Sequence, residues 1–301
     1  MPNPLNLMPI PSDVADLRGL VAKFAPRDGE HKTAIASLCL VRYSSASTPL
    51  LGVLSPALCI AAQGNKEVVL GNEVYSYGPG HHLVSSFELP TSARMLGATA
   101  AKPYLGLRLH FDPAKIAPLI EEARLAIPSA SEPERGLYLA PTPPALLDAV
   151  LRLVRLLECP REIPILAPMI EREILFRLLL DESRAVLHRM AQAESPPQRV
   201  AVSIAWLRNN FRQPMRIDDL ARRAGMSASG FHQWFRGITG MSPLQYQKQL
   251  RLQEARSMLR NERLDIASVS RRVGYESSSQ FSREYSRLFG NPPSKALQNP
   301  A

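Results

Sequence analysis

One sequence unit occurs twice between Arg216 and Pro293, and this repeat constrains the fold more than any other feature of the chain. The first copy reads IDDLARRAGMSASGFHQWFRGITGMSP, and the second reads DIASVSRRVGYESSSQFSREYSRLFGNPP. The Arg-Arg-x-Gly pattern of the first copy recurs 49 residues later, and its Gly-x-x-Pro pattern recurs 50 residues later. We therefore expect two copies of one structural unit, with one extra residue in the second turn.

Each copy has the parts of a helix-turn-helix, which we place at residues 217–238 and 265–289. An aspartate begins an amphipathic helix (Asp218 or Asp265), a glycine ends it, and a serine-rich segment leads into a second helix. On that second helix, apolar residues at spacing i, i+4, i+7 face the core, and polar residues face outward. The outward residues are Ser229, His232, Gln233 and Arg236 in the first copy, and Ser279, Ser282, Arg283 and Ser286 in the second. Hydroxyl, amide and guanidinium groups suit the base edges of a DNA major groove.

A long connecting helix is predicted between the two copies, at residues 243–260. It begins with a proline, and leucine, tyrosine and alanine side chains provide its apolar anchors. About 16 residues span roughly 24 Å at 1.5 Å per residue. With the width of the flanking units, this helix is long enough to hold two recognition helices about one DNA turn, roughly 34 Å, apart.

The segment from about Gln198 to Leu297 resembles the DNA-binding domain of AraC/XylS-type transcription regulators. The motifs GMSASGFHQWF, TGMSPLQYQKQLRLQEAR, VGYESSSQFSREYSRLFG and NPP carry this resemblance. It implies an all-α domain at 199–301 with seven helices, two of which enter consecutive major grooves of double-stranded DNA. It implies base contacts by Ser229, His232, Gln233, Ser279, Ser282 and Arg283. The family often has a bulkier residue at Ser229 and Gln or Arg at His232, so base preference is not carried over at these positions.

The positive charge of the chain is concentrated in the part that carries the repeat. The whole chain has a formal net charge of +9. From Ser195 onward there are 17 Lys and Arg against 7 Asp and Glu, a net charge of +10, whereas the remainder has a net charge of −1. This asymmetry is typical of a phosphate-binding domain joined to a neutral partner domain. The candidate phosphate contacts are Arg212, Arg216, Arg236, Lys248, Arg251 and Arg287.

The cysteines and the N-terminus point to a reducing cytoplasm. Cys39, Cys59 and Cys159 are too few and too scattered for a disulfide framework or a zinc site. The N-terminus lacks the basic start and apolar run of a signal peptide. The longest uncharged stretch, Tyr43 to Asn65, is interrupted by polar residues and proline, so we expect no membrane partner.

Short strands dominate the N-terminal part after a first helix at Asp13 to Ala25. The predicted strands are Ile35 to Tyr43, Leu58 to Gln63, Lys66 to Leu70, Glu73 to Tyr77, His82 to Phe87, Ala93 to Ala98 and Leu105 to Phe111. Turns are expected at Gly71-Asn72 and at Gly78-Pro79-Gly80. Strands at this pitch favour a small β-barrel or sandwich, which is able to enclose a ligand. The predicted fold class is thus α+β, with a β-barrel or sandwich, flanking helices and a C-terminal all-α domain.

The segments RYSSASTPLLGVLSPALCIAAQGNKEVVLGNEVYSYGPGHHLVSSFELP and PYLGLRLHFDP resemble the cupin-like N-terminal domain of one AraC-type subfamily. The resemblance implies a domain that binds a small-molecule effector, whose identity it does not fix. This chain departs from the subfamily before Pro56, where Leu54-Ser55 replace the common Tyr-Glu, and after Gly64, where Asn65 replaces a basic residue. The candidate pocket residues are Arg42, Gln63, His81, His82, Glu88 and Arg94.

Metal binding and cysteine sensing are alternatives for the same domain. His81 and His82 are adjacent, so on a strand they point to opposite faces and do not share a metal ion. We expect instead that one of them is a polar pocket or core residue. Cys39 and Cys59 lie in apolar strands, where a structural thiol is the default; sensing needs an exposed thiolate. We expect no metal, no cofactor and no catalytic residue.

Helical periodicity returns after Pro113. Helices are predicted at Pro113 to Ala126, Pro143 to Glu158 and Pro164 to about Met190, and the last two carry wide apolar stripes. The family resemblance suggests that these helices pair two subunits into a homodimer, and packing onto the barrel of the same chain is the alternative. A linker is predicted at 193–198, where two prolines interrupt any continuous helix. The N-terminal domain is therefore placed at 1–192.

The combined features predict an effector-responsive, sequence-specific DNA-binding transcription regulator. Its expected partners are double-stranded DNA, a small effector, a second copy of the chain and RNA polymerase. One alternative is a metal-dependent cupin enzyme fused to a DNA-binding module. Another is a regulator controlled by a protein partner or by its own abundance. The clustered cysteines of a DNA-repair methyl acceptor, which some relatives carry, are missing from the sequence.

Overall fold

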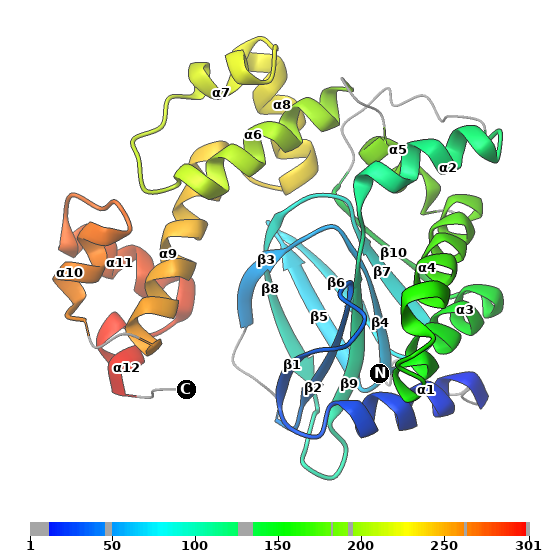
Figure 1. The fold of residues 1–301 in the computed structure, drawn as a ribbon. Coiled ribbons are helices and arrows are strands. Elements are labelled where there is room, and N and C mark those ends of the chain that lie inside the picture. Colours follow the sequence, from blue (N-terminus) through cyan, green and yellow to red (C-terminus); the bar gives the residue numbers. More distant parts are fainter. Residues whose placement is uncertain are drawn as a thin grey trace, which may run out of the picture. The chain divides into compact units, whose positions relative to one another are not determined.

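The chain forms two compact units, Met1–Ala193 and Glu194–Ala301 (Figure 1). The computed structural model describes residues 12–45, 50–125, 135–181, 183–191, 195–261 and 264–298. The first unit combines two antiparallel sheets with helices, and the second is helical. The α+β fold class with an all-α C-terminal domain is confirmed.

The two sheets of the first unit form a sandwich. Within the described residues, one sheet has six strands in the order β1-β2-β9-β4-β7-β10, and the other has four in the order β3-β8-β5-β6. The bounds are Gly29–Lys32 (β1), Leu38–Tyr43 (β2), Leu50–Leu54 (β3), Ala57–Gln63 (β4), Asn65–Leu70 (β5), Glu73–Tyr77 (β6), His81–Ser85 (β7), Leu89–Leu96 (β8), Tyr104–His110 (β9) and Leu137–Pro141 (β10).

The six-stranded sheet is buried on both faces, because helices cover one face and the smaller sheet covers the other. Strand β9 shows this directly, since Leu105, Leu107 and Leu109 belong to the core shared with the helices. The residues between them, Gly106 and Arg108, face the opposite side, as successive side chains of a strand must. The helices of this core are α1 (Ser12–Phe24), α2 (Ile116–Glu122), α3 (Pro144–Arg155), α4 (Ile163–Leu180) and α5 (Arg184–Ala191).

Three strands, β1, β3 and β10, were not predicted. Strand β1 is four residues long, and its sequence GEHK has no apolar residue to give a strand pattern. Strand β10 follows the segment 126–134, which lies outside the described residues, and completes the sheet edge beside β7 with Leu137 opposite Ser85. Short edge strands carry few of the alternating apolar residues on which sequence patterns depend.

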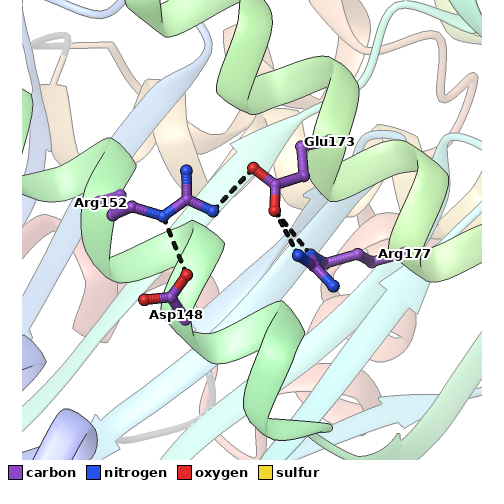
Figure 2. A network of polar contacts seen from close by, with 4 residues as sticks. All are labelled: Asp148, Arg152, Glu173 and Arg177. Carbon is purple, nitrogen blue, oxygen red and sulfur yellow. Dashed lines mark hydrogen bonds and ion pairs between the residues drawn. The ribbon is translucent and has the colours of Figure 1, made fainter.

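Helices α3 and α4 are joined by a polar network as well as by apolar packing (Figure 2). Arg152 Nε donates to Asp148 Oδ2 at 2.9 Å, and its Nη2 donates to Glu173 Oε2 at 2.7 Å. Arg177 Nε donates to the other oxygen of Glu173 at 2.8 Å. The hydrogen bond from Arg152 is the main reason that the pKa of Glu173 lies below its usual value.

The single helix predicted from Pro164 to Met190 is wrong, because two helices occupy this stretch. Helix α4 ends at Asp181, whose backbone is extended with ψ of 177°. The Asp181 carboxylate accepts a hydrogen bond from the Ser183 backbone N–H at 2.9 Å. The Ser183 hydroxyl donates to the Leu178 carbonyl at 3.0 Å, which caps α4. Short polar side chains compete in this way with the helical backbone, and the apolar stripe alone did not reveal the break.

Seven helices make up the second unit within the described residues, as the family resemblance implies. They are α6 (Pro196–Asn210), α7 (Ile217–Arg223), α8 (Ala228–Thr239), α9 (Pro243–Asn261), α10 (Ile266–Arg272), α11 (Ser278–Phe289) and α12 (Pro293–Gln298). Helix α6 begins inside the predicted linker, so the linker prediction was too long. Pro196 and Pro197 occupy the first positions of α6, where proline is tolerated, and Ser195 is its N-cap.

Candidate nucleic-acid interface and effector site

The two repeat copies fold into helix-turn-helix units whose second helices have the same ends. Helix α8 begins at Ser227, whose hydroxyl accepts from the Gly230 N–H, and α11 begins at Ser277, which accepts from the Gln280 N–H. Each helix ends at a glycine in the left-handed region with φ of 72°. The repeated sequence positions therefore have repeated structural roles.

Aromatic side chains hold each recognition helix in place. In the first helix-turn-helix, Phe231 and Phe235 have ring centres 5.5 Å apart, and Tyr246 of α9 meets Phe235 edge-on at 5.4 Å. In the second helix-turn-helix, Phe281 and Tyr285 repeat the first pair, also at 5.5 Å. With these rings fully buried, one face of each helix is fixed toward the core, and the opposite face is turned outward.

The predicted base-contact residues all lie on the outward faces of α8 and α11. Ser229 and Gln233 are exposed on α8, and His232 between them is half-buried. Ser279 and Arg283 are exposed on α11, and Ser282 is half-buried. One face of short donors and acceptors per helix matches what a major groove accepts. The contacts themselves stay a prediction.

Helix α9 joins the two helix-turn-helix motifs through hydrogen bonds to backbone carbonyl groups. The Arg251 guanidinium donates to Phe211 O at 2.7 Å and to Gly274 O at 2.8 Å. One side chain thus joins the end of α6 to the turn of the second helix-turn-helix. Gln247 donates to Phe211 O at 2.9 Å and to Gln213 O at 2.7 Å. Gly274 has φ of +90°, and a Cβ there would lie 2.3 Å from the Arg212 carbonyl oxygen.

Three of the six candidate phosphate contacts pair with the protein's own groups. Arg251 uses four of its N–H donors on backbone carbonyl groups, so we do not keep it among the proposed phosphate contacts. Lys248 Nζ lies 2.8 Å from Glu284 Oε1. Arg212 is half-exposed and pairs with Glu254 at 3.0 Å. The other three candidates, Arg216, Arg236 and Arg287, are exposed.

The structure does not bring the six predicted pocket residues together. Arg94 is 54% exposed and pairs with Glu67 on the outer face of the small sheet. His82 is fully buried, but beneath the helices, 3.6 Å from Asp181. The prediction that these two line a common pocket was wrong, because alternation places them on surfaces that face away from the sandwich interior. His82 is a core residue, which was one of the two expected outcomes for the histidine pair.

The other pocket candidates lie at strand ends or in loops. Arg42 is 3.8 Å from Asp28 at the end of β2, and Gln63 donates to the Pro103 carbonyl at 2.8 Å. His81 and Glu88 are half-buried. Lys66, Tyr77, Tyr104 and Arg108 are among the polar residues that face the inside of the sandwich.

The described residues were predicted to hold neither a metal ion nor a reactive thiol. Within them there is no group of three or more His, Cys, Asp or Glu side chains that is able to hold a metal ion. Cys39 and Cys59 are buried, and Cys159 is exposed. Burial raises the pKa of the Cys39 thiol, which disfavours the reactive thiolate.

A family model for the first unit decides the family. Residues 34–186, about half of the chain, match the model described as the AraC-type transcriptional regulator N-terminus. This chain belongs to the AraC-type transcriptional regulators. Residues 220–299 match a helix-turn-helix domain model, which spans the second helix-turn-helix unit and most of the first in this AraC-type chain.

The AraC-type chain is similar to transcriptional activators named RhaS. The RhaS of Escherichia coli O1:K1 / APEC is 30% identical over 150 residues, which cover 50% of this chain and 53% of that protein. The RhaS of Pectobacterium carotovorum subsp. carotovorum (strain PC1) is 30% identical over 129 residues, which cover 43% and 46%. The chain thus spans about half the length of the curated relatives it matches.

ToxT of Vibrio cholerae shares the two-unit AraC-type fold. The ToxT structure from strain O395 bound to (E)-4-(8-methylnaphthalen-1-yl)but-3-enoic acid has a TM-score of 0.56 with 13% identity, covering 86% of this chain and 97% of that one. The unsaturated fatty acid bound ToxT from strain SCE256 has a TM-score of 0.55 with 9% identity, covering 86% and 94%. At this identity the likeness concerns the fold alone. None of the described helices is long and apolar enough to cross a membrane.

Proposed function

We propose that this AraC-type chain is a sequence-specific DNA-binding transcription regulator. One observation carries the proposal: two helix-turn-helix units with matching caps present exposed polar faces on α8 and α11. Each recognition helix reads one of two adjacent major-groove segments. The 19 residues of α9 span about 28 Å, which suits two helices about one DNA turn apart when their own widths are added.

The proposed division of labour follows from side-chain chemistry. Ser229, His232 and Gln233 contact bases through α8, and Ser279, Ser282 and Arg283 do so through α11. The exposed arginines Arg216, Arg236 and Arg287 contact phosphates, which positions the protein without reading sequence. Arg212 and Lys248, whose side chains are about half exposed, do so as well. The net charge of +10 from Ser195 onward supports this assignment.

In-vitro selection of genomic DNA fragments by the purified full-length protein tests the proposal. We expect enrichment of a few sites that contain two sequence blocks about 10 base pairs apart. Matched selections with single-block variants of the enriched site show whether both units read DNA. Enrichment without any shared sequence would contradict the proposal, since it would indicate phosphate binding alone.

The first unit is proposed to bind a small effector that alters DNA binding. Residues 34–186 match the AraC-type N-terminal model, and ToxT, whose fold is similar, has been solved with a small organic acid. The effector acts by changing the relative free energies of states that bind DNA differently.

Homodimerisation is proposed through helix α4. Most of its apolar stripe is buried within the same unit, as Ile170, Ile174 and Leu178 show. Ile165 and Met169, which lie one helical turn apart, remain 70% and 63% exposed. Two neighbouring exposed apolar side chains on one helix face are typical of a surface that a partner covers.

A further inference from the structure

Polar side chains from both sheets face each other inside the N-terminal sandwich. On the small sheet, Lys66 of β5 lies opposite Tyr77 of β6 and Met95 of β8, so these three side chains project from one face. The Lys66 ammonium nitrogen lies 6.0 Å from the centre of the Tyr104 ring, which belongs to β9 of the other sheet. The face of the small sheet that carries Lys66 is therefore the face turned toward the large sheet.

Arg108 joins this group from the large sheet. It follows Tyr104 by four residues on β9, so the two side chains share a face, and it pairs in register with Cys39 and Cys59. Its Nη2 donates to Glu30 Oε1 at 2.9 Å. Within the described residues, the buried Arg108 Nε has no hydrogen-bond partner.

Lys66 and Tyr77 bring polar groups into the region between the two sheets. Lys66 is only 8% exposed; within the described residues it forms no salt bridge, and its ammonium group lies over the Tyr104 ring. Tyr77 is 3% exposed, and its hydroxyl lies beside that of Tyr104, which adds to the effect of burial in raising the pKa of Tyr77. Burial of such groups is costly unless another group hydrogen-bonds them.

The charges in this region leave one positive group without a counter-ion. Glu30 pairs with Arg108, whereas Lys66 forms no salt bridge within the described residues. Burial is the main cause that lowers the pKa of Lys66; the charge of Arg108 acts in the same direction, and Cys59 and Glu30 oppose it. One added negative charge balances Lys66, whereas a phosphate dianion would leave a second buried charge unbalanced.

We propose that Lys66 and Tyr77 bind the carboxylate of a small organic acid between the two sheets. The ammonium group of Lys66 and the hydroxyl of Tyr77 donate to the carboxylate oxygens, and Arg108 Nε provides a further donor on the facing sheet. Val68 and Leu70 continue the inward face of β5, and Met95 lies beside Lys66. These neighbours favour an acid whose remaining part is apolar. The inference rests on the proposed effector-binding role of the first unit and specifies the class of effector.

Scanning calorimetry of the full-length protein with small acids as probes tests this inference. The probes are acetate, octanoate and benzoate, with acetamide, octanamide and benzamide as uncharged matches and chloride to equalise ionic strength. Both tryptophans, Trp206 and Trp234, lie in the second unit. The calorimetric transition that coincides with the change in tryptophan fluorescence therefore belongs to the second unit, and the other transition belongs to the first. We expect the acids, but not the amides, to raise the transition of the first unit by about 3–6 °C at a tenfold excess over Kd.

Variants separate the proposed site from general salt effects. Lys66→Met removes the charge while keeping a similar length, and Lys102→Met makes the same change at an exposed lysine on the β8–β9 connection. We expect Lys66→Met to raise the unliganded transition and to abolish the shift by acids, and Lys102→Met to do neither. Tyr77→Phe, which keeps the ring, should at least halve the shift if Lys66→Met does not fold.

Three outcomes would overturn the inference: equal shifts by acids and amides, shifts that persist in Lys66→Met, or no shift by any acid beyond that of chloride. None of them depends on DNA. A protein that fails this test but selects two-block DNA sites remains a regulator with another effector, whereas one that binds acids but selects no DNA contradicts the proposed function instead.

Discussion

Arg283 and Arg287 lie one turn apart on α11 and are both exposed, yet different roles are proposed for them. Arg283→Ala is expected to reduce discrimination at one base position by about 1–3 kcal/mol, because a guanidinium that pairs with a base edge is lost. Arg287→Ala is expected to weaken all sites alike and to reduce the slope of log affinity against log salt by about 1. Titrations of matched and mutated sites at several salt concentrations distinguish the two. Identical profiles for both variants would refute the assignment.

At the scale of single residues, the sequence predicted exposed faces better than buried partners. Alternation and helical spacing depend on local order, so the outward positions of α8 and α11 were accessible from the sequence. Arg251 was assigned to phosphate because its carbonyl partners, Phe211 and Gly274, are distant in sequence. Lys66 was missed as a pocket residue, although NKEVVL places it in phase with Val68 and Leu70; that alternation was the signal for an inward lysine.

Two glycines at equivalent turns differ in what surrounds them, which gives an element-scale prediction. Gly225 and Gly274 both have positive φ, so alanine at either costs about 1–2 kcal/mol. A Cβ at Gly274 also meets the Arg212 carbonyl, whereas at Gly225 the nearest atom, 3.7 Å away, belongs to the flexible Arg199 side chain. We expect Gly274→Ala to destabilise the second unit by about 1–3 kcal/mol more than Gly225→Ala does. Urea unfolding followed by tryptophan fluorescence measures the difference, and equal losses would contradict it.

The polar network between α3 and α4 gives a pH-dependent contribution to stability (Figure 2). The pKa of Glu173 is lowered from 4.5, mainly by the Arg152 hydrogen bond. A lowered carboxyl pKa stabilises the fold above the unfolded value, and this stabilisation is lost as pH falls through the folded value. Glu173→Gln is expected to cost about 1 kcal/mol or less at pH 7, with a smaller deficit below pH 4.5. Calorimetry at both pH values checks this, with Glu121→Gln on the exposed side of α2 as the control.

Elements were predictable where their pattern is long and regular. The recognition helices and the connecting helix have caps and apolar spacing within the sequence itself. The break between α4 and α5 depends on two side chains, Asp181 and Ser183, whose hydrogen bonds override a continuous apolar stripe. The edge strands were missed because their stability comes from neighbouring strands rather than from their own residues.

At the scale of the whole molecule, the exposed pair on α4 predicts the oligomeric state. Ile165→Glu with Met169→Glu is expected to convert a dimer to a monomer, because two charges would be buried without partners. Val74→Glu, at a residue that is 59% exposed on β6 of the same unit, is the matched control and should leave the dimer intact. Sedimentation velocity distinguishes the species. A wild-type protein that is monomeric throughout would rule out this surface.

The hydrogen bonds of Arg251 and Gln247 also have a consequence for the DNA that such a protein regulates. These hydrogen bonds fix α9 to both helix-turn-helix motifs, so the two recognition helices keep one spacing. One inserted base pair between the two blocks would turn one block by about 34° around the DNA axis and out of reach of its recognition helix. A substitution in either block removes only the contacts at that position. Promoters under this control are therefore expected to tolerate single base substitutions within the blocks during evolution, but to conserve the number of base pairs between the blocks.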